Sequence, residues 1–183
     1  MYQWLLYGHL IGVILLVLGT GVFVAGVDGL RRCEDIHALR TSLAIATLGT
    51  RTLAPGGALL LGFGIAMATL RWSLADTWIA AALLLVALLG ANGLHAERRL
   101  RVLATALDRT DDAALPPAVR RLSRAPALHA SNRAGLPLLA ELEYLMTMKP
   151  TAGPLTISLL IAAAAVGVVA LTTVAPLRPR RPA

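Results

Sequence analysis

The sequence predicts an all-α fold: a polytopic membrane protein whose four transmembrane helices form a bundle, with a helical cytoplasmic loop between the third and fourth helices. Hydrophobic residues make up 57% of the 183 residues and charged residues 15%, and the mean hydropathy is +0.70. The chain therefore has more apolar surface than a soluble domain of this length can bury. Four stretches without charge are also long enough to cross about 30 Å of hydrocarbon. The basic residues lie between and after these stretches, as in the flanks of membrane proteins.

The four stretches cover approximately residues 4–27, 52–70, 77–94 and 154–174 of a single membrane domain, residues 1–183. No basic residue precedes the first stretch, its apolar part is longer than that of a secretory signal, and no A-x-A site follows it. We therefore expect the first stretch to be a retained helix.

The arginines predict the orientation of the helices. Most of them lie in the segments that join the first helix to the second and the third to the fourth, which places both segments in the cytoplasm by the positive-inside rule. The sequence thus predicts a multi-pass protein of the bacterial inner membrane with both termini outside. This arrangement leaves the tail PLRPRRPA outside with three arginines. Five aromatic residues fall at the outer end, where such rings anchor at the headgroup level: Tyr2, Trp4, Tyr7, Trp72 and Trp78.

The predicted cytoplasmic loop covers about residues 95–149. Its first part continues the third helix beyond the membrane, because Leu100, Leu103 and Leu107 share one helical face. PPAVRRLSRAP predicts a brief amphipathic helix, HASNRAG a loop, and LPLLAELEYLMTMKP a further helix that Pro150 ends. We expect this last helix either to lie in the inner membrane interface or to cap the bundle.

Three clusters of arginine border the predicted inner side of the membrane. Such residues bind nucleotide phosphates, acidic partners or anionic lipid, and we expect lipid, at about 1 kcal/mol for each residue near the surface. Because the charge of +7 lies in the membrane flanks, no nucleic-acid partner is predicted. The expected lipid-binding residues are Arg31, Arg32, Arg98, Arg99, Arg101, Arg120, Arg121 and Arg124.

Small residues predict where helices approach one another, because close backbone contact drives helix packing in lipid. The expected contact residues are Gly8, Gly12, Gly21, Ala25 and Gly29 in the first helix and Ala54, Ala58, Gly62 and Ala66 in the second.

His9 is the main candidate for a functional site, because an ionisable residue about 7 to 8 Å inside a membrane helix is costly. Met67 lies at about the same depth, counted back from Arg71. A His with a Met can bind low-spin haem or Cu(I), and Arg71 would then meet a haem propionate. Two alternatives remain: the imidazole bonds a carbonyl of a neighbouring helix while Met67 fills the core, or His9 has a proton or quinone role.

The other polar residues point to structure rather than chemistry. Asn92 predicts an interhelical hydrogen bond, and Asp28 with Arg32 and Arg31 with Asp35 predict surface ion pairs at the i, i+4 spacing. Cys33 is the single cysteine, which excludes an intrachain disulfide. The sequence contains no Walker A, HExxH or GxSxG motif.

The opening WLLYGHLIGVILLVLGTG, with the histidine two residues after a tyrosine, resembles a family of small bacterial predicted integral membrane proteins of unassigned function. The likeness extends through PGGALLLGFGIAMA and YLMTMKP. The chain is also distantly similar to the copper-resistance D-type membrane proteins and the J-type protoporphyrinogen oxidases, which place a histidine early in the first helix. The resemblance implies the membrane fold and a bacterial cytoplasmic membrane.

These observations predict a non-catalytic accessory or scaffold subunit that meets another membrane protein, or further copies of itself, through its small-residue faces and its loop. No cofactor is expected on this interpretation. The alternative is a haem b- or copper-linked redox protein that uses His9 and Met67. A third hypothesis is a small oligomeric permease.

Overall fold

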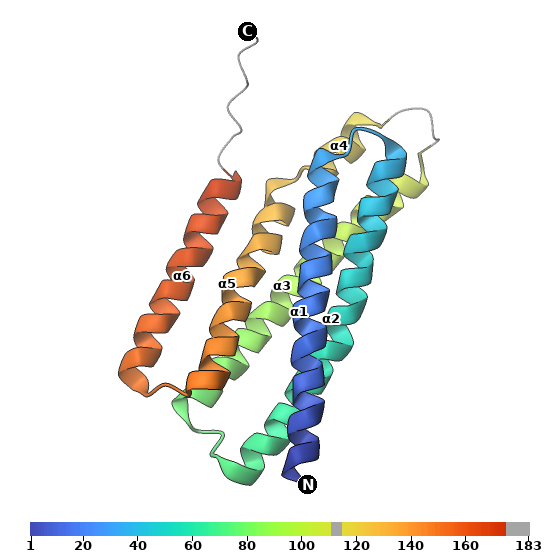
Figure 1. The fold of residues 1–183 in the computed structure, drawn as a ribbon. Helices are drawn as coiled ribbons and strands as arrows, with labels where there is room; N and C mark the ends of the chain where they lie inside the picture. Colours follow the sequence, from blue (N-terminus) through green and yellow to red (C-terminus); the bar gives the residue numbers. More distant parts are fainter. Residues whose placement is uncertain (111–114, 175–183) are drawn as a thin grey trace.

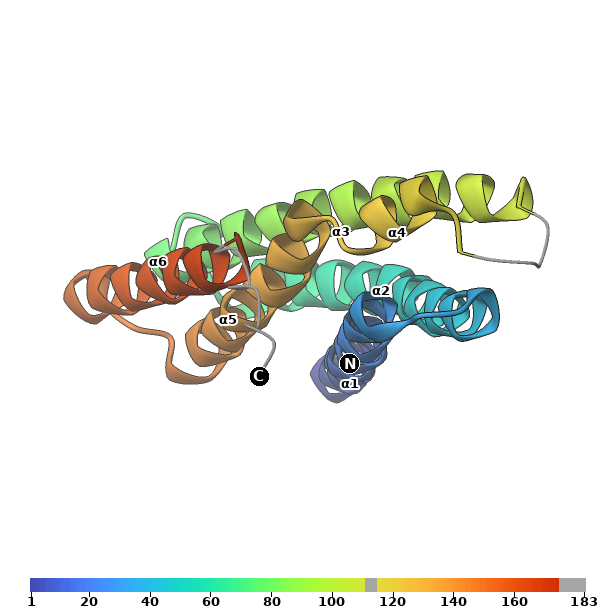
Figure 2. The same cartoon turned by 90° about the horizontal axis from the view of Figure 1, so that it is seen from above.

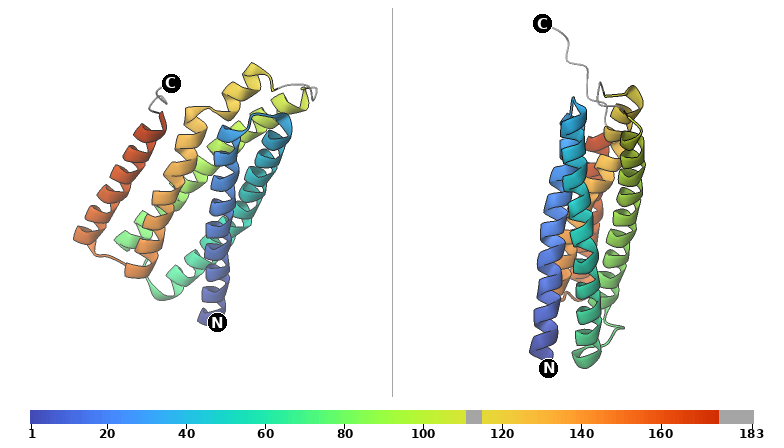
Figure 3. Two further views of the ribbon diagram at one scale, coloured as in Figure 1. Left: turned by 45° about the horizontal axis from the view of Figure 1, so that its top comes forward. Right: turned by 90° about the vertical axis from the view of Figure 1, so that its right-hand side faces the viewer.

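The computed structural model describes residues 1–110 and 115–174, in which every regular element is a helix (Figure 1). The predicted all-α fold is confirmed, and α1, α2, α3 and α6 are each long and apolar enough to cross a membrane. Together with α5 they run side by side (Figure 3), while α4 is a short helix at one end. The elements are α1 (Tyr2–Arg32), α2 (Ile36–Arg71), α3 (Thr77–Asp108), α4 (Pro117–Ser123), α5 (Pro126–Met148) and α6 (Ala152–Val174).

Three helices, α1, α2 and α3, continue beyond the predicted apolar stretches. All three extensions lie at the end of the molecule where the chain turns from α1 into α2. There the helices bury an aliphatic core in which Val27, Leu30 and Leu39 have no exposed surface. The helical period of apolar residues continues past the first charges, so the extension is amphipathic. The predicted boundaries of α1 and α2 stopped too early because they followed charge rather than period, whereas the predicted continuation of the third helix past residue 94 is confirmed in α3. The other large members of this core are Phe23, Ile36, Leu43, Leu100, Leu103, Leu107, Leu115, Val119 and Leu128.

The backbones of α1 and α2 approach each other closely. A Cβ atom added to Gly26 would lie 2.3 Å from the backbone nitrogen of Ala46, and one added to Gly12 would lie 2.6 Å from that of Leu60. Only glycine permits such an approach, which is how membrane helices gain packing contacts. The close positions on α1 recur every seven residues, at Gly12, Gly19 and Gly26, and on α2 at Gly49 and Gly56.

This spacing corrects part of the predicted packing. Gly8, Gly12 and Gly29 do face α2, but Gly21 and Gly62 have no neighbouring atom within 4 Å of an added Cβ. Ala25, Ala54 and Ala58 are exposed. The predicted contacts of these residues are wrong because two helices that stay together over many turns meet every 3.5 residues on average, not every four.

The helix α5 makes the topology of the chain differ from the predicted one. It is continuous through HASNRAG, so the predicted loop there is wrong, and its 23 residues extend about 35 Å. Its last residues reach the end of the molecule opposite to α4, where the Lys149 ammonium lies 4.7 Å from the centre of the Trp72 ring. Residues 95–149 were predicted to form a loop at one end of the molecule. They are therefore not confined to that end. As a result α6 runs back, and the chain begins and α6 finishes at opposite ends (Figure 1).

The helices α3, α5 and α6 form a second group. Their shared core contains Ala82, Leu85, Leu142, Leu145 and Leu155. Figure 2 shows α6 on the side of this group that is remote from α1 and α2. The two groups touch where α1 meets α5 and α2 meets α3, and at the end with α4 leucines of α3 and α5 join the core of α1 and α2.

Candidate functional site

A cavity of about 250 Å³ lies between the two groups of helices, at the end where α1 begins. Its polar lining includes His9 from α1 and Glu143 and Lys149 from the end of α5. The remaining lining is largely apolar and comes from α1, α2, α3, α5 and the α2–α3 turn. It includes Leu6, Leu10, Val13, Leu60, Leu61, Ile65, Met67, Ala68, Trp72, Trp78, Ile79, Ala82, Val86 and Met146.

The His9 side chain is held by α2. Its Nδ1 lies 3.0 Å from the carbonyl oxygen of Leu60, and only 7% of the residue is exposed. A carbonyl only accepts hydrogen bonds, so Nδ1 carries the proton and donates it. The ring fits because position 64 is glycine, where an added Cβ would lie 3.2 Å from the imidazole. The hydrogen bond to a neighbouring helix, one of the predicted alternatives, is thus present, and in the neutral form of the ring Nε2 keeps its lone pair.

The structure brings together two of the three residues predicted for a haem or copper site. Met67 is buried and lines the same cavity as His9. The third residue, Arg71, does not line it, and its guanidinium lies 5.4 Å from the centre of the Tyr2 ring. Their roles in cofactor binding stay a prediction.

Aromatic rings and one lysine form the outer rim of the cavity. The rings of Trp72 and Trp78 meet edge to face with centroids 5.9 Å apart, and Tyr2 lies beside Trp72. Lys149 ends α5 in the left-handed conformation, with φ of 47°, and places its ammonium over both tryptophans. Such cation–π contacts contribute about 0.5 to 1 kcal/mol each at exposed sites. The prediction that these three aromatic residues share one end is confirmed.

Glu143, Met146 and Lys149 also belong to this site, although the sequence predicts them in a loop at the other end. The reason is that the polar residues of α5 lower its hydropathy. One signal was available: Pro126 at a first helical turn and Met148 before Pro150 bound a stretch of 23 residues, which is long enough to cross a bilayer.

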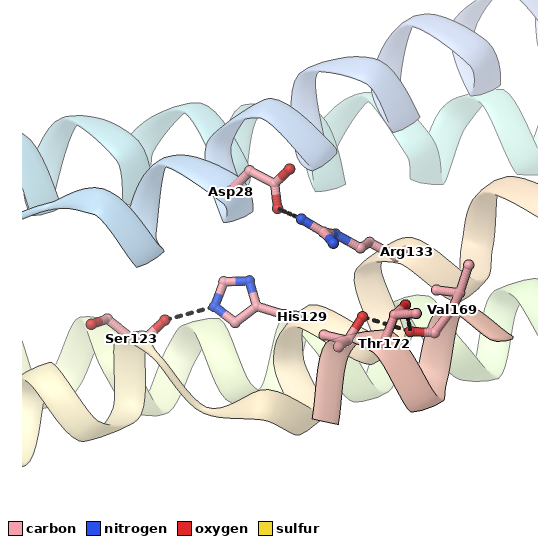
Figure 4. A network of polar contacts seen from close by, with 7 residues as sticks. Asp28, Ser123, His129, Arg133, Val169 and Thr172 are labelled. Carbon is pink, nitrogen blue, oxygen red and sulfur yellow. Dashed lines mark hydrogen bonds and ion pairs between the residues drawn. The ribbon is translucent and has the colours of Figure 1, made fainter. Parts of the chain in front are cut away.

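A second polar group lies at the opposite, arginine-rich end (Figure 4). Asp28 of α1 pairs with Arg133 of α5 at 3.5 Å, so the predicted pair of Asp28 with Arg32 is wrong. Below this pair His129, which is fully buried, donates from Nε2 to the Ser123 carbonyl oxygen at 2.9 Å. Its Nδ1 has no hydrogen-bond partner in the part of the chain that the structure describes.

Burial lowers the pKa of His129 below its ordinary value of 6.5, and the nearby Arg31 acts in the same direction. The Ser123 carbonyl and Asp28 oppose the shift. His129 lies in the first turn of α5, outside the apolar stretches, and the shift favours its neutral form near pH 7.

Polar side chains of α5 also face the other helices. Asn92 of α3 donates to the backbone oxygen of Ser131 at 3.0 Å and accepts from the Ser131 hydroxyl, so the predicted interhelical hydrogen bond is confirmed. Asn132 and Glu141 are buried, and the Asn132 amide and the Glu141 Oε1 have no partner within residues 1–110 and 115–174. These polar side chains face the other helices. They explain why α5 has a low mean hydropathy although it packs among helices.

The predicted lipid-binding arginines all lie at the end remote from the cavity. Arg31 and Arg32 end α1, and Arg98, Arg99 and Arg101 lie on the extension of α3. Arg99 donates to His95 at 2.8 Å and Arg101 pairs with Glu97 at 2.9 Å. The three arginines of the third cluster border a shallow hollow beside α4: Arg120, Arg121 and Arg124.

Within the described residues, no group of three or more His, Cys, Asp or Glu side chains is placed to hold a metal ion. The chain matches no protein-family model, and neither the curated proteins nor the solved structures show a match to it. The resemblance inferred from the sequence therefore stays a prediction.

Proposed function

We propose that the protein is an integral protein of the bacterial cytoplasmic membrane. The supporting observation is the apolar exterior of α1, α2, α3 and α6, where Leu18, Leu84 and Ile161 are 59%, 62% and 65% exposed. Exposed apolar side chains in this number need lipid around them, since soluble monomers rarely expose large contiguous apolar patches. Further exposed residues of this surface are Leu10, Ile14, Leu48, Leu88, Ile157, Leu160, Val168 and Leu171.

In this proposal α5 is a fifth crossing helix. Its length of about 35 Å exceeds the roughly 30 Å of the hydrocarbon core, so its first turn, with His129, lies outside the core, and neighbouring helices cover Asn132 and Glu141. The break in backbone bonding at Pro137 is tolerated because other helices surround it.

Five crossings place the two termini on opposite sides. The end with α4 and the arginine clusters lies in the cytoplasm, and the end with Tyr2, Trp72 and Lys149 lies outside. This replaces the prediction that both termini lie outside.

The function that fits this architecture is that of a non-catalytic accessory or scaffold subunit, with the cytoplasmic arginines on anionic lipid. Ala54, Ala58 and Gly62 follow one another at spacing four on the exterior of α2, outside the contact with α1. Such a stripe permits close approach of a helix from another membrane protein or a second copy.

The test is the size of the assembly purified in mild detergent. We expect a complex larger than the 19.2 kDa chain that Ala58→Trp disrupts. The control Leu84→Trp places the same bulk on the exterior of α3 and should leave the complex intact. A purely monomeric wild-type protein, or equal disruption by both variants, would contradict the proposal.

The redox alternative keeps one supporting observation, which is that His9 and Met67 line one cavity. It predicts that the protein purified from membranes carries a haem absorption band or bound copper that His9→Ala removes. A colourless, copper-free wild-type protein would contradict it.

A further inference from the structure

The geometry points to the cavity beside His9 as a binding site for a neutral phenolic molecule that enters from the bilayer. This inference rests on the proposed membrane function, because it requires lipid at the rim of the cavity.

The hydrogen-bonding direction of the site follows from His9. Because Nδ1 donates to the Leu60 carbonyl, the neutral ring can offer a ligand only the Nε2 lone pair, which is an acceptor. The contact with Leu60 is the only hydrogen bond of His9 within the described residues, and the residue is 7% exposed in the cavity wall. An acceptor at the cavity that has no protein partner favours a ligand that brings a donor.

Glu143 adds a second acceptor to the wall when it is ionised. A ligand cation would meet these acceptors too, but the Lys149 ammonium already occupies the aromatic rim. Burying a second cation beside it would also cost its hydration. A neutral hydroxyl group satisfies Nε2 without that cost.

The rest of the wall favours an aromatic ring. Thioethers and indoles make good contacts with aromatic rings, and Met67, Met146 and Trp78 all line the cavity. Apolar cavities of about 150 Å³ hold one benzene ring, so a cavity of about 250 Å³ accepts a substituted phenol.

The rim supplies a route from lipid. Leu10 of α1, Ile65 of α2 and Leu83 of α3 line the cavity and are 48%, 42% and 36% exposed. These side chains face the same apolar surroundings as the exterior of the helices. A lipophilic molecule therefore reaches His9 without crossing the charged ends.

Two probes of nearly the same shape test the inference: 4-bromophenol and its methyl ether, 4-bromoanisole, which lacks the donor. Bromine quenches tryptophan fluorescence on contact, and Trp72 and Trp78 lie at the cavity. The exposed Trp4 is replaced with phenylalanine in all samples. Concentrations are corrected for partition of each probe into the detergent.

We expect saturable quenching, with 4-bromophenol binding about 5- to 10-fold more tightly than 4-bromoanisole, the effect of one hydrogen bond. His9→Leu should abolish this preference, so that the two probes bind the variant with equal affinity. Equal affinities in the wild type, or a preference that survives His9→Leu, would overturn the inference whether or not the variant folds well. The readout is independent of partner binding, so its failure is distinct from failure of the proposed accessory role.

Discussion

The two groups of helices are held together by different means. Between α1 and α2, glycines let backbone meet backbone over the whole length of the pair, with Gly26 against Ala46 and Gly12 against Leu60. Within α3, α5 and α6, no glycine is in such close contact, and the helices meet through leucines and through Asn92 with Ser131. The first group is held together by contacts between backbones, whereas the packing of the second group depends on side chains.

The comparison shows what each kind of packing permits. Close backbone contact leaves no space for a ligand, because any added atom separates the helices. Side-chain packing leaves gaps, and the cavity lies between the two groups at the end opposite to the core that they share. His9 belongs to the pair of α1 and α2, and Glu143 belongs to the group of α3, α5 and α6. The geometry of the site therefore depends on how the two groups dock.

The largest expected effect on stability comes from a side chain introduced at the closest contact between α1 and α2. Gly26→Leu places a side chain where even a Cβ would lie 2.3 Å from the Ala46 backbone. We expect the free energy of unfolding to fall by about 3 kcal/mol or more, because overpacking forces the two backbones apart. Thermal unfolding in detergent measures this loss of stability.

The control for this variant is Gly21→Leu on the same helix, where an added Cβ meets no atom within 4 Å. It should be neutral or slightly stabilising, because glycine is a poor helix former. Equal losses for both variants would contradict the backbone-contact description of α1 and α2.

A smaller effect is expected from the polar link of the second group. Asn92→Leu removes both hydrogen bonds to Ser131 and should cost about 1 kcal/mol, as for other interhelical hydrogen bonds in membranes. The control Thr156→Val removes a hydroxyl that bonds only within α6. If Asn92→Leu cost no more than the control, α3 and α5 would not depend on this link.

The ion pair between the groups should contribute less. The side chains of Arg133 and Asp28 are 40% and 29% exposed, so water and salt screen their attraction. A double-mutant cycle with Arg133→Gln and Asp28→Asn should give a coupling below about 1 kcal/mol that falls further at high salt. A larger, salt-independent coupling would mean that the two groups dock more tightly than the contacts indicate.

The smallest effect concerns pH. Because burial lowers the pKa of His129 in the folded state, the unfolded chain binds more protons, and stability rises with pH through this range. The contribution is fully present above pH 6.5 and is lost as the pH falls through the unfolded pKa toward the folded one. His129→Gln, which keeps a donor for Ser123, should flatten the stability profile between pH 7.5 and 5. An unchanged profile would contradict the burial of a neutral ring.

Sequence patterns predicted the parts of this fold that depend on long apolar runs. The stretches at 4–27, 52–70, 77–94 and 154–174 lie within α1, α2, α3 and α6, because an uncharged run of this length has few other stable conformations. The pattern revealed only the second half of α5, as the helix predicted for LPLLAELEYLMTMKP, because the buried His129, Asn132 and Glu141 lower the average hydropathy of the whole helix. Whether such residues face lipid or helices is a tertiary property.

The candidate site was predicted in part for the same reason. Counting residues from the outer end predicts one depth for His9 and Met67, and in the structure both residues line one cavity. Glu143 and Lys149 could not be assigned without knowing that α5 returns to that end. The tautomer of His9 follows from the Leu60 carbonyl, a contact that no sequence pattern encodes.

The account depends most directly on α5 as a fifth crossing helix. Single cysteines at Ser73, Thr151 and Glu34, in a Cys33→Ser background, can be labelled with a membrane-impermeant maleimide in intact cells; all three positions are exposed. The account predicts labelling at 73 and 151 from outside, and at 34 only after permeabilisation. If position 151 were protected together with 34, α5 would not cross the membrane, and Lys149 could not lie against Trp72.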